Sequence, residues 1–421
     1  MSKARPRVVI VGGGFGGLYA AKALSRAPVQ VTLCDRNNYH VFQPLLYQVA
    51  TGGLAPEDIA APIRRILRGQ RNADVLLVDV QSIDLERRAV VHAQGTLTYD
   101  YLIVATGARH AYFGHDDWAS SAPGLKTLDD ALAIRRRIYM AFEEAERSAA
   151  GGQPGQSLSF VVIGGGPTGV ELAGAMAEIA RRTLRRNFRH IDPAAAHITL
   201  VEAGDRLLPG FPPELSAVAL RTLQKMGVEV RLGRPVTDVT PEGVRLGTQW
   251  IGASAVLWAA GVEASALGAG LGAPRDRAGR VGVRTDLSLP GHPEVFVVGD
   301  LASLPSAAGH PLPGLAPVAM QEGRWAARNV ERQVAGRPTL PFRYQDRGAL
   351  ATIGRSAAVA ALPGVRLKGF LAWLAWLFIH ILYLAGFDNR VAVLWRWAYA
   401  YATFERSARL ITGARGTGVS G

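Results

Sequence analysis

The chain has 421 residues, of which 48% are hydrophobic and 19% charged, and its formal net charge is +13. This length and composition predict two or three globular domains and exclude a disordered or fibrous protein. The only cysteine is Cys34, which excludes disulfide frameworks, Cys-ligated zinc or iron–sulfur sites and dithiol redox pairs, and no metal site is expected. The basic excess suits either a nucleic acid or an anionic lipid surface.

The first predicted nucleotide site follows a short apolar strand, Val8–Val11. Gly12 permits a tight turn, Gly14 lets a pyrophosphate approach the backbone, and Gly17 lets the next helix, expected over residues 17–26, lie close to the sheet. The N–H groups at the start of that helix would face the phosphates.

The strand after this helix, Val29–Cys34, ends at Asp35. This carboxylate follows the glycines by about 20 residues, the position typical of a group that bonds ribose hydroxyls. Strand, glycines, helix, strand and acid in this order predict a dinucleotide site. The competing interpretation is a glycine-rich turn in an ordinary α/β domain.

A second copy of this pattern begins at the strand Phe160–Ile163. Gly164, Gly166 and Gly169 repeat the three glycine roles, and the strand Ile198–Val201 ends at Glu202. A carboxylate there accepts from a free ribose 2′-OH and repels a 2′-phosphate, which favours NADH over NADPH. Arg206, four residues on, would weaken that preference if it bound a phosphate.

Glu171 follows the second glycine turn, and its role stays open. It either supplies favourable charge in the first turn of the helix or places a carboxylate where nicotinamide and flavin meet. The segment closing this half, residues 258–262, contains Gly261, an expected NAD contact.

Two further strands run into small-residue turns, at residues 101–108 and 294–300. In order and spacing they resemble the flavin-binding segments of the two-dinucleotide flavoprotein oxidoreductases. This resemblance implies that Asp300 bonds the ribityl chain or pyrophosphate of FAD and Asp35 the adenosine ribose. Asp300 at a helix N-cap is the alternative. The expected FAD contacts are Gly12, Gly14, Phe15, Gly17, Asp35, Arg36, Ala105, Thr106, Gly107, Gly299, Asp300, Ala316 and Val318.

The predicted fold is α/β, with two Rossmann-like dinucleotide-binding domains and a C-terminal helical membrane-association segment. The NAD domain is expected as an insertion in the FAD domain, with a flexible linker at residues 151–156. The predicted domains are an FAD part at residues 1–122, the NAD domain at 123–262, a second FAD part at 263–340, and a region for membrane anchoring and dimerisation at 341–421. The N-terminal apolar run is too short for a signal peptide, so a cytoplasmic location is expected.

A flavin accepts a hydride from nicotinamide without a protein nucleophile, so the next electron acceptor must be found. Relatives that reduce disulfides, peroxides or sulfide need redox cysteines, whereas Cys34 is more simply a small buried apolar residue. The remaining acceptors are a quinone, a separate electron-transfer protein or oxygen.

The composition of the C-terminal region favours a quinone among these three electron acceptors. Residues 370–387 carry no formal charge if His380 is neutral, although they include Gly386. The next segment, residues 391–404, ends at Phe404 and contains the aromatic residues Trp395, Trp397, Tyr399 and Tyr401. Four arginines lie among or just beside these aromatic residues: Arg390, Arg396, Arg406 and Arg409. A monotopic membrane segment places Trp and Tyr at headgroup depth and Arg on lipid phosphate. A spanning helix, for which the stretch is marginal in length, and a soluble core or dimer interface are the alternatives. No nucleic-acid motif is visible, so no nucleic-acid partner is expected.

At this point the resemblance becomes specific. Residues 39–50, 164–171 and 316–323, together with the aromatic tail, resemble the type II NADH dehydrogenases, which are single-subunit, non-proton-pumping NADH:quinone oxidoreductases. The resemblance implies FAD and NADH as cofactor and substrate, a peripheral position on the cytoplasmic face of the cell membrane, and a homodimer. It also implies that residues 316–323 line the flavin and the quinone channel, with Gln321 facing the quinone.

One position departs from the family pattern Ala-Gln-x-Ala-x-Gln, because Pro317 replaces the first glutamine. This removes a side-chain donor and a backbone N–H, so that glutamine's role does not carry over. Gln321 as an ordinary residue at a helix N-terminus is the alternative to a quinone contact. Glu171 and Gln321 are the expected catalytic residues.

The resulting hypothesis is NADH reduction of FAD followed by two-electron reduction of a membrane quinone. A soluble NAD(P)H-dependent reductase of a ferredoxin- or rubredoxin-type carrier is the second hypothesis. A redox-sensing protein that binds both nucleotides without useful turnover is the third.

Overall fold

The computed structural model describes residues 5–152, 158–306, 309, 311–384, 387–403 and 408–412. The chain divides into two compact units. Unit 1 comprises Met1–Val41, Ala60–Arg109 and Val262–Asp346, and unit 2 comprises Phe42–Ile59, His110–Gly261 and Arg347–Gly421. Most of the predicted linker, Gly386, Phe404 and Arg406 lie outside the described residues.

Unit 1 is built on a sheet with the strand order β20-β21-β9-β1-β2-β5, parallel throughout except between β20 and β21. Strands β1, β9 and β21 are buried on both faces, as near-continuous apolar runs in a parallel sheet require. Val11 pairs with Cys34 and Val104, so the turns after all three strands meet at one sheet edge. The bounds are β1 Arg7–Val11, β2 Gln30–Asp35, β5 Ala73–Leu77, β9 Tyr101–Val104, β20 Ser288–Leu289 and β21 His292–Val297.

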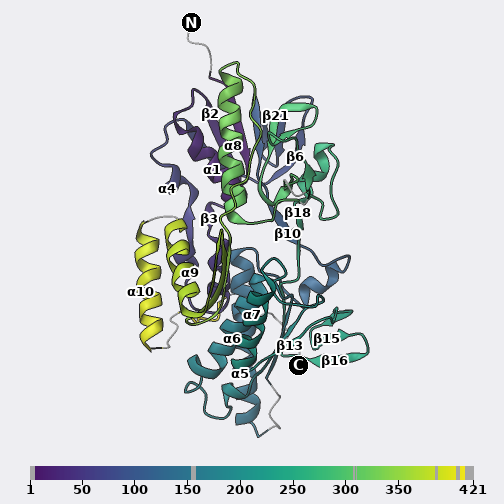
Figure 1. Ribbon diagram of the computed structural model, residues 1–421, viewed down its shortest axis with the longest axis vertical. Helices are drawn as coiled ribbons and strands as arrows, with labels where there is room; N and C mark the ends of the chain where they lie inside the picture. The colour runs from purple at the N-terminus through teal and green to yellow at the C-terminus, as the bar shows by residue number, and fades with distance from the viewer. Residues whose placement is uncertain are drawn as a thin grey trace. The chain divides into compact units, whose positions relative to one another are not determined.

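The helices of unit 1 are α1, Phe15–Ala23, α4, Ile63–Leu67, and α8, Ala316–Val334. Helix α1 begins earlier than expected, at Phe15, and ends in a 3₁₀ turn, Leu24–Arg26. Helix α8 packs along α1 (Figure 1). The smaller strands that begin in this unit are β3 Tyr39–Val41, β4 Ala60–Pro62, β6 Val80–Asp84, β7 Ala89–His92, β8 Gly95–Thr98, β10 Ala108–His110, β18 Val262–Ala264, β19 Val281–Gly282 and β22 Ala302–Ser303.

Unit 2 contains a second parallel sheet, with the order β13-β12-β11-β17. Ile163 pairs with Val201 and Trp258, which repeats the register of the first sheet around its own glycine turn. The bounds are β11 Ser159–Ile163, β12 His197–Val201, β13 Val228–Arg231 and β17 Ala255–Trp258, with an antiparallel sheet of β14 Asp238–Thr240, β15 Gly243–Leu246 and β16 Gln249–Gly252. The helices before residue 347 are α2 Leu46–Ala50, α3 Pro56–Ile59, α5 Leu128–Ala150, α6 Pro167–Glu178 and α7 Pro213–Lys225.

The C-terminal part of unit 2 starts with an antiparallel sheet, β23 Ala349–Gly354, β24 Ala357–Leu362 and β25 Val365–Lys368. Helix α9, Gly369–Tyr383, packs on this sheet, and α10, Phe387–Thr403, lies beside α9 (Figure 1). Among the described residues no helix has both the length and the apolar character needed to cross a membrane. The expected α/β fold, with two Rossmann-like sheets and a helical C-terminal segment, is therefore confirmed.

Candidate functional site

The two glycine turns have the same backbone geometry. Gly12 and Gly164 have φ angles of +104° and +108°, which side chains rarely tolerate. A Cβ at Gly12 would lie 2.3 Å from the Ala105 carbonyl oxygen, and one at Gly164 would lie 2.4 Å from that of Ala259. Both turns therefore need glycine for backbone conformation and for close approach to the neighbouring strand.

The later glycines of each turn also correspond. A Cβ at Gly17 or Gly169 would lie 1.8 Å from the carbonyl oxygen of Gly12 or Gly164, so both helices press on their own turn. A Cβ at Gly14 or Gly166 would meet nothing within 4 Å. The space over these two residues is open, as a pyrophosphate would require.

The helices that follow the turns begin without a capping side chain. Gly14 is the N-cap of α1 and Gly166 that of α6, and neither helix has an acidic residue in its first turn. The first N–H groups of a helix have no intrahelical acceptor. Both helix starts can accordingly bind an anionic group.

The acids after the second strands brace the turns in the same way. Asp35 accepts from the N–H groups of Gly13 at 2.5 Å and Asn37 at 2.6 Å. Glu202 accepts from Gly165 at 2.5 Å and Gly204 at 2.6 Å. A carboxylate has about four acceptor sites, so each acid keeps acceptor capacity for ribose hydroxyls. Burial outweighs these hydrogen bonds and raises the pKa of Asp35.

Arg206 does not lie free to bind a phosphate near Glu202. Its guanidinium donates to the carbonyl oxygens of Phe211 and Pro209, each at 2.7 Å, and to the Ser216 hydroxyl at 3.3 Å. The residue that would have weakened the preference for NADH is thus occupied by its own loop.

The other expected FAD contacts in unit 1 collect near the sheet edge. Ala105 follows β9, the buried Thr106 Oγ1 has no hydrogen-bond partner among the described residues, and Gly107 has a φ of +67°. Phe15 contacts the His40 ring edge-on at 5.0 Å between centroids, whereas Arg36 is exposed. An unpaired buried hydroxyl beside open backbone fits a polar ligand group.

Asp300 lies inside the 3₁₀ turn Gly299–Leu301, whose N-cap is Val298, so the N-cap alternative for Asp300 is wrong. Asp300 and Gly299 line a cavity in unit 1 together with Val318. Ala316 is the first residue of α8.

Pro317 stands in the first turn of α8, where its missing N–H has no intrahelical acceptor and costs nothing. Gln321 lies beyond that first turn, so the alternative of a helix N-terminal residue is wrong. Its amide donates to the Gln345 carbonyl oxygen at 3.0 Å and accepts from the Gln345 N–H at 3.0 Å. A role toward a quinone would require this reciprocal pair to open.

Glu171 is the fifth residue of α6, not part of its first turn, so the helix-dipole alternative is wrong. It accepts from the Thr352 N–H on β23 at 3.4 Å. Burial raises the pKa of Glu171 well above its usual value. Burial thus favours the protonated carboxyl group, which is the form that can donate a proton.

Glu171 lines a cavity in unit 2. Trp397 Nε1 donates to Gln48 Oε1 at 2.7 Å, and Gln48 Nε2 donates to the Tyr47 hydroxyl at 3.0 Å. These three residues and Trp376 line the cavity with Glu171. The lining therefore combines aromatic rings with four acidic or basic residues, Glu171, Glu178, Arg182 and Arg355.

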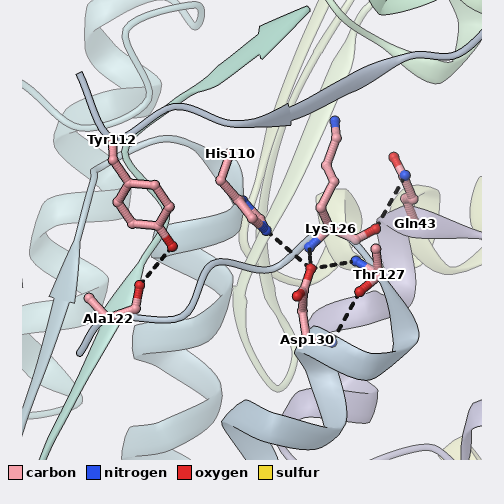
Figure 2. Close-up of polar contacts among 7 residues, drawn as sticks. All are labelled: Gln43, His110, Tyr112, Ala122, Lys126, Thr127 and Asp130. Carbon is pink, nitrogen blue, oxygen red and sulfur yellow. Dashed lines mark hydrogen bonds and ion pairs between the residues drawn. The ribbon is translucent and has the colours of Figure 1, made fainter. Parts of the chain in front are cut away.

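Asp130 organises a second polar centre of unit 2, shown in Figure 2. Its carboxylate accepts from the backbone of Lys126 at 3.0 Å and Thr127 at 2.8 Å and contacts His110 Nε2 at 3.1 Å. The Thr127 hydroxyl oxygen accepts a capping bond from the Asp130 N–H at 3.1 Å. This centre fixes the start of α5 and lowers the pKa of Asp130 through the bonds from His110 and the backbone, which outweigh burial.

Sequence reasoning missed the unit 2 cavity and two buried residues of unit 1. His40 donates from Nδ1 to the Gly13 carbonyl at 3.0 Å, and Glu322 accepts from the Gly299 N–H at 2.6 Å. Both residues lie in segments on which the family resemblance rests. In each segment an ionisable residue stands among apolar neighbours, and this pattern could have indicated a buried polar group.

Two nucleotide turns of one design, each ending a parallel sheet, define a class of proteins with two Rossmann-type sites. The family model for pyridine nucleotide-disulphide oxidoreductases matches residues 6–323. A type II NADH:quinone oxidoreductase, Ndh, from Mycobacterium tuberculosis is 46% identical over 97% of this chain and 90% of its own. The chain belongs to the type II NADH:quinone oxidoreductases, within the pyridine nucleotide-disulphide oxidoreductase family.

Solved structures agree on the fold. NDH2 from Plasmodium falciparum in complex with NADH has a TM-score of 0.83 at 20% identity, covering 94% of this chain and 98% of that one. Putidaredoxin reductase, in a covalent complex with putidaredoxin, has a TM-score of 0.65 at 22% identity, covering 86% and 82%. Because both share the fold, the fold alone does not decide the electron acceptor.

Proposed function

We propose that the chain is an FAD-dependent oxidoreductase that oxidises NADH and reduces a membrane quinone without pumping protons. The observation that carries this is the 46% identity over 97% of the chain to a type II NADH:quinone oxidoreductase. FAD, when bound, supplies a two-electron carrier that accepts a hydride and passes electrons on. The single cysteine fits this acceptor, since no dithiol relay is available.

FAD is assigned to unit 1 and NADH to unit 2. The Gly12–Gly17 turn and the start of α1 would bind the FAD pyrophosphate, with Asp35 at the adenosine ribose and Asp300 at the ribityl chain. The open space over Gly14 and the unpaired Thr106 hydroxyl support this fit. The predicted functional division at residues 122, 262 and 340 stays a prediction, whereas the compact units change at residues 109, 261 and 346, with residues 42–59 in unit 2.

For NADH, the Gly164–Gly169 turn would bind the pyrophosphate and Glu202 the adenosine ribose diol. The carboxylate repels a 2′-phosphate, and Arg206 is held by carbonyl oxygens of its own loop. Gly261 would contact the same ligand from the turn after β17. NADH is therefore the proposed substrate in preference to NADPH.

The quinone is assigned to the aromatic cavity of unit 2. Trp376, Trp397 and Tyr47 offer flat apolar surfaces to a ring, and Glu171 offers a proton because quinol formation consumes protons. Gln321 belongs to unit 1 and is not among the residues that line this cavity, so its role toward the quinone stays a prediction.

The membrane surface is assigned to α9 and α10. Leu371, Phe378 and Leu382 recur on one face of α9 and are all exposed, and Trp395 of α10 is 73% exposed. Such an apolar helix face fits the interfacial region of a bilayer. We propose peripheral attachment at the cytoplasmic face, with a homodimer as the oligomeric state to be checked by light scattering.

Two arginines among the C-terminal aromatic residues, Arg390 and Arg396, have partners within unit 2. Arg390 donates to the carbonyl oxygens of Leu384 and Leu382 at the end of α9, at 3.0 and 2.8 Å. Arg396 pairs with Asp58 at 3.2 Å. These two guanidinium groups hold α10 within unit 2, and their binding of lipid phosphate stays a prediction.

Steady-state oxidation of NADH with different acceptors tests the proposal. A soluble quinone analogue should support turnover, whereas a ferredoxin-type carrier should not. Glu171→Gln should lower quinone turnover by about 100-fold, the scale of a lost proton donor, and leave NADH-dependent bleaching of the flavin unchanged. Glu144→Gln, an exposed acid on α5, is the matched control. Turnover with the carrier alone would favour the soluble reductase, and turnover with neither would favour a sensor.

A further inference from the structure

Glu322 is a buried acid of α8 to which the glycine turns assign no task. Its side chain is 2% exposed. Its Oε2 atom accepts from the Gly299 N–H at 2.6 Å. Gly299 has a φ of +74° and leads directly into Asp300. The carboxyl group therefore stabilises a turn whose backbone conformation residues other than glycine rarely adopt.

The next residue of α8 contacts the other FAD-binding segment. A Cβ at Gly323 would lie 2.1 Å from the Gly16 carbonyl oxygen, so the backbones of α8 and α1 touch at this point. Two consecutive residues of α8 thus tie the Gly12–Gly17 turn and the Gly299–Asp300 turn to one helix. These turns come from opposite ends of unit 1 in sequence.

Burial and a neighbouring acid both disfavour the charged form of Glu322. Burial, and then the charge of Asp300, raise the pKa of Glu322 to about 8, against the lowering effect of the Gly299 bond. Two other charged residues line the same cavity, and each has its own partner: Glu263 pairs with Arg109 at 2.6 Å and Arg280 with Asp276 at 2.7 Å. Asp300 is the neighbouring charge that raises the pKa of Glu322.

We propose that Glu322 is a positioning residue that fixes the Gly299–Asp300 turn so that Asp300 can bind FAD. This rests on the proposed assignment of FAD to unit 1. Ionisation of Glu322 places a second negative charge beside Asp300 and near an anionic ligand. FAD affinity should then fall as the pH rises through 8.

Retention of FAD by the purified holoenzyme tests this directly. Flavin fluorescence released on dilution would be followed between pH 6 and 9 for the wild type, Glu322→Gln and Glu322→Ala. The wild type should hold FAD about tenfold more weakly at pH 9 than at pH 6, the scale of one unfavourable charge contact. Glu322→Gln keeps an acceptor for Gly299 and cannot ionise, so it should retain low-pH affinity without the pH step. Glu322→Ala leaves the Gly299 N–H unpaired and should bind FAD at least about tenfold more weakly at every pH.

Glu331→Gln, an acid elsewhere on α8, is the control and should keep the wild-type pH step. An unchanged pH step in Glu322→Gln, or wild-type affinity in Glu322→Ala, would overturn the positioning role. If Glu322→Ala does not fold, the Glu322→Gln profile decides alone. A wild type that bound no FAD at any pH would instead contradict the proposed function.

Discussion

At the residue scale, the two nucleotide turns differ in the acid that accepts hydrogen bonds from their backbone, which is Asp35 in the first turn and Glu202 in the second. Asp35 and Glu202 both use their two oxygens on backbone N–H groups of their own turn. The longer Glu202 side chain reaches Gly165 and Gly204 in the turn assigned to NADH. In the proposed assignment, its charge both stiffens the turn and would repel a 2′-phosphate.

Glu202→Gln separates these two effects. The amide keeps one acceptor oxygen but presents an N–H₂ group to the second backbone N–H, so kcat/KM for NADH should fall about tenfold. The loss for NADPH should be smaller because repulsion of the 2′-phosphate is removed. Glu229→Gln, an exposed acid on β13, should change neither value. An undiminished preference for NADH in Glu202→Gln would exclude charge repulsion as its source.

His40 makes the stability of unit 1 depend on pH. Burial lowers the pKa of His40 to about 4, from 6.5, even though its bond to the Gly13 carbonyl favours the charged form. The unfolded chain binds a proton in this window and the folded chain does not, so stability is complete above pH 6.5 and falls towards pH 4 by up to about 3 kcal/mol. Chemical denaturation of the wild type and His40→Asn should show a steeper acid loss in the wild type. Parallel pH profiles would contradict this.

At the element scale, the sequence predicted what is local and missed what the chain assembles from distant segments. Strand, glycine turn, helix and acid lie within one stretch, so the geometry at Gly12 and Gly164 could be anticipated. The unit 2 cavity could not, because its hydrogen bond from Trp397 to Gln48 joins positions 349 residues apart. The pairing of Gln321 with Gln345 likewise depends on where the chain returns after α8.

The contact between α8 and α1 gives a prediction for the element scale. Gly323→Ala places a Cβ 2.1 Å from a backbone oxygen of α1. The gain in helix propensity, about 1 kcal/mol, does not offset this overlap, so unit 1 should lose about 1–3 kcal/mol and release FAD faster. Gly69→Ala, where nothing lies within 4 Å, is the matched control. Equal melting temperatures for the two variants would show that the helices can separate without cost.

At the scale of the whole molecule, the net charge of +13 and the exposed apolar face of α9 support the proposed association with an anionic membrane surface. Phe378→Glu with Leu382→Glu should weaken co-sedimentation with anionic phospholipid vesicles by at least about tenfold, because two large apolar side chains no longer enter the bilayer. Leu77→Glu replaces a residue of similar exposure on β5, 58% against 63% for Phe378, and should have little effect. Equal losses in both variants would indicate that overall charge, not this face, determines binding.

The central claim is that electrons taken from NADH are delivered to a quinone. Anaerobic stopped-flow absorbance of the holoenzyme tests it in one measurement. NADH should bleach the flavin band, and a soluble quinone analogue mixed in afterwards should restore it at least as fast as steady-state turnover. A flavin that NADH bleaches but the quinone does not restore within the turnover time would contradict the account.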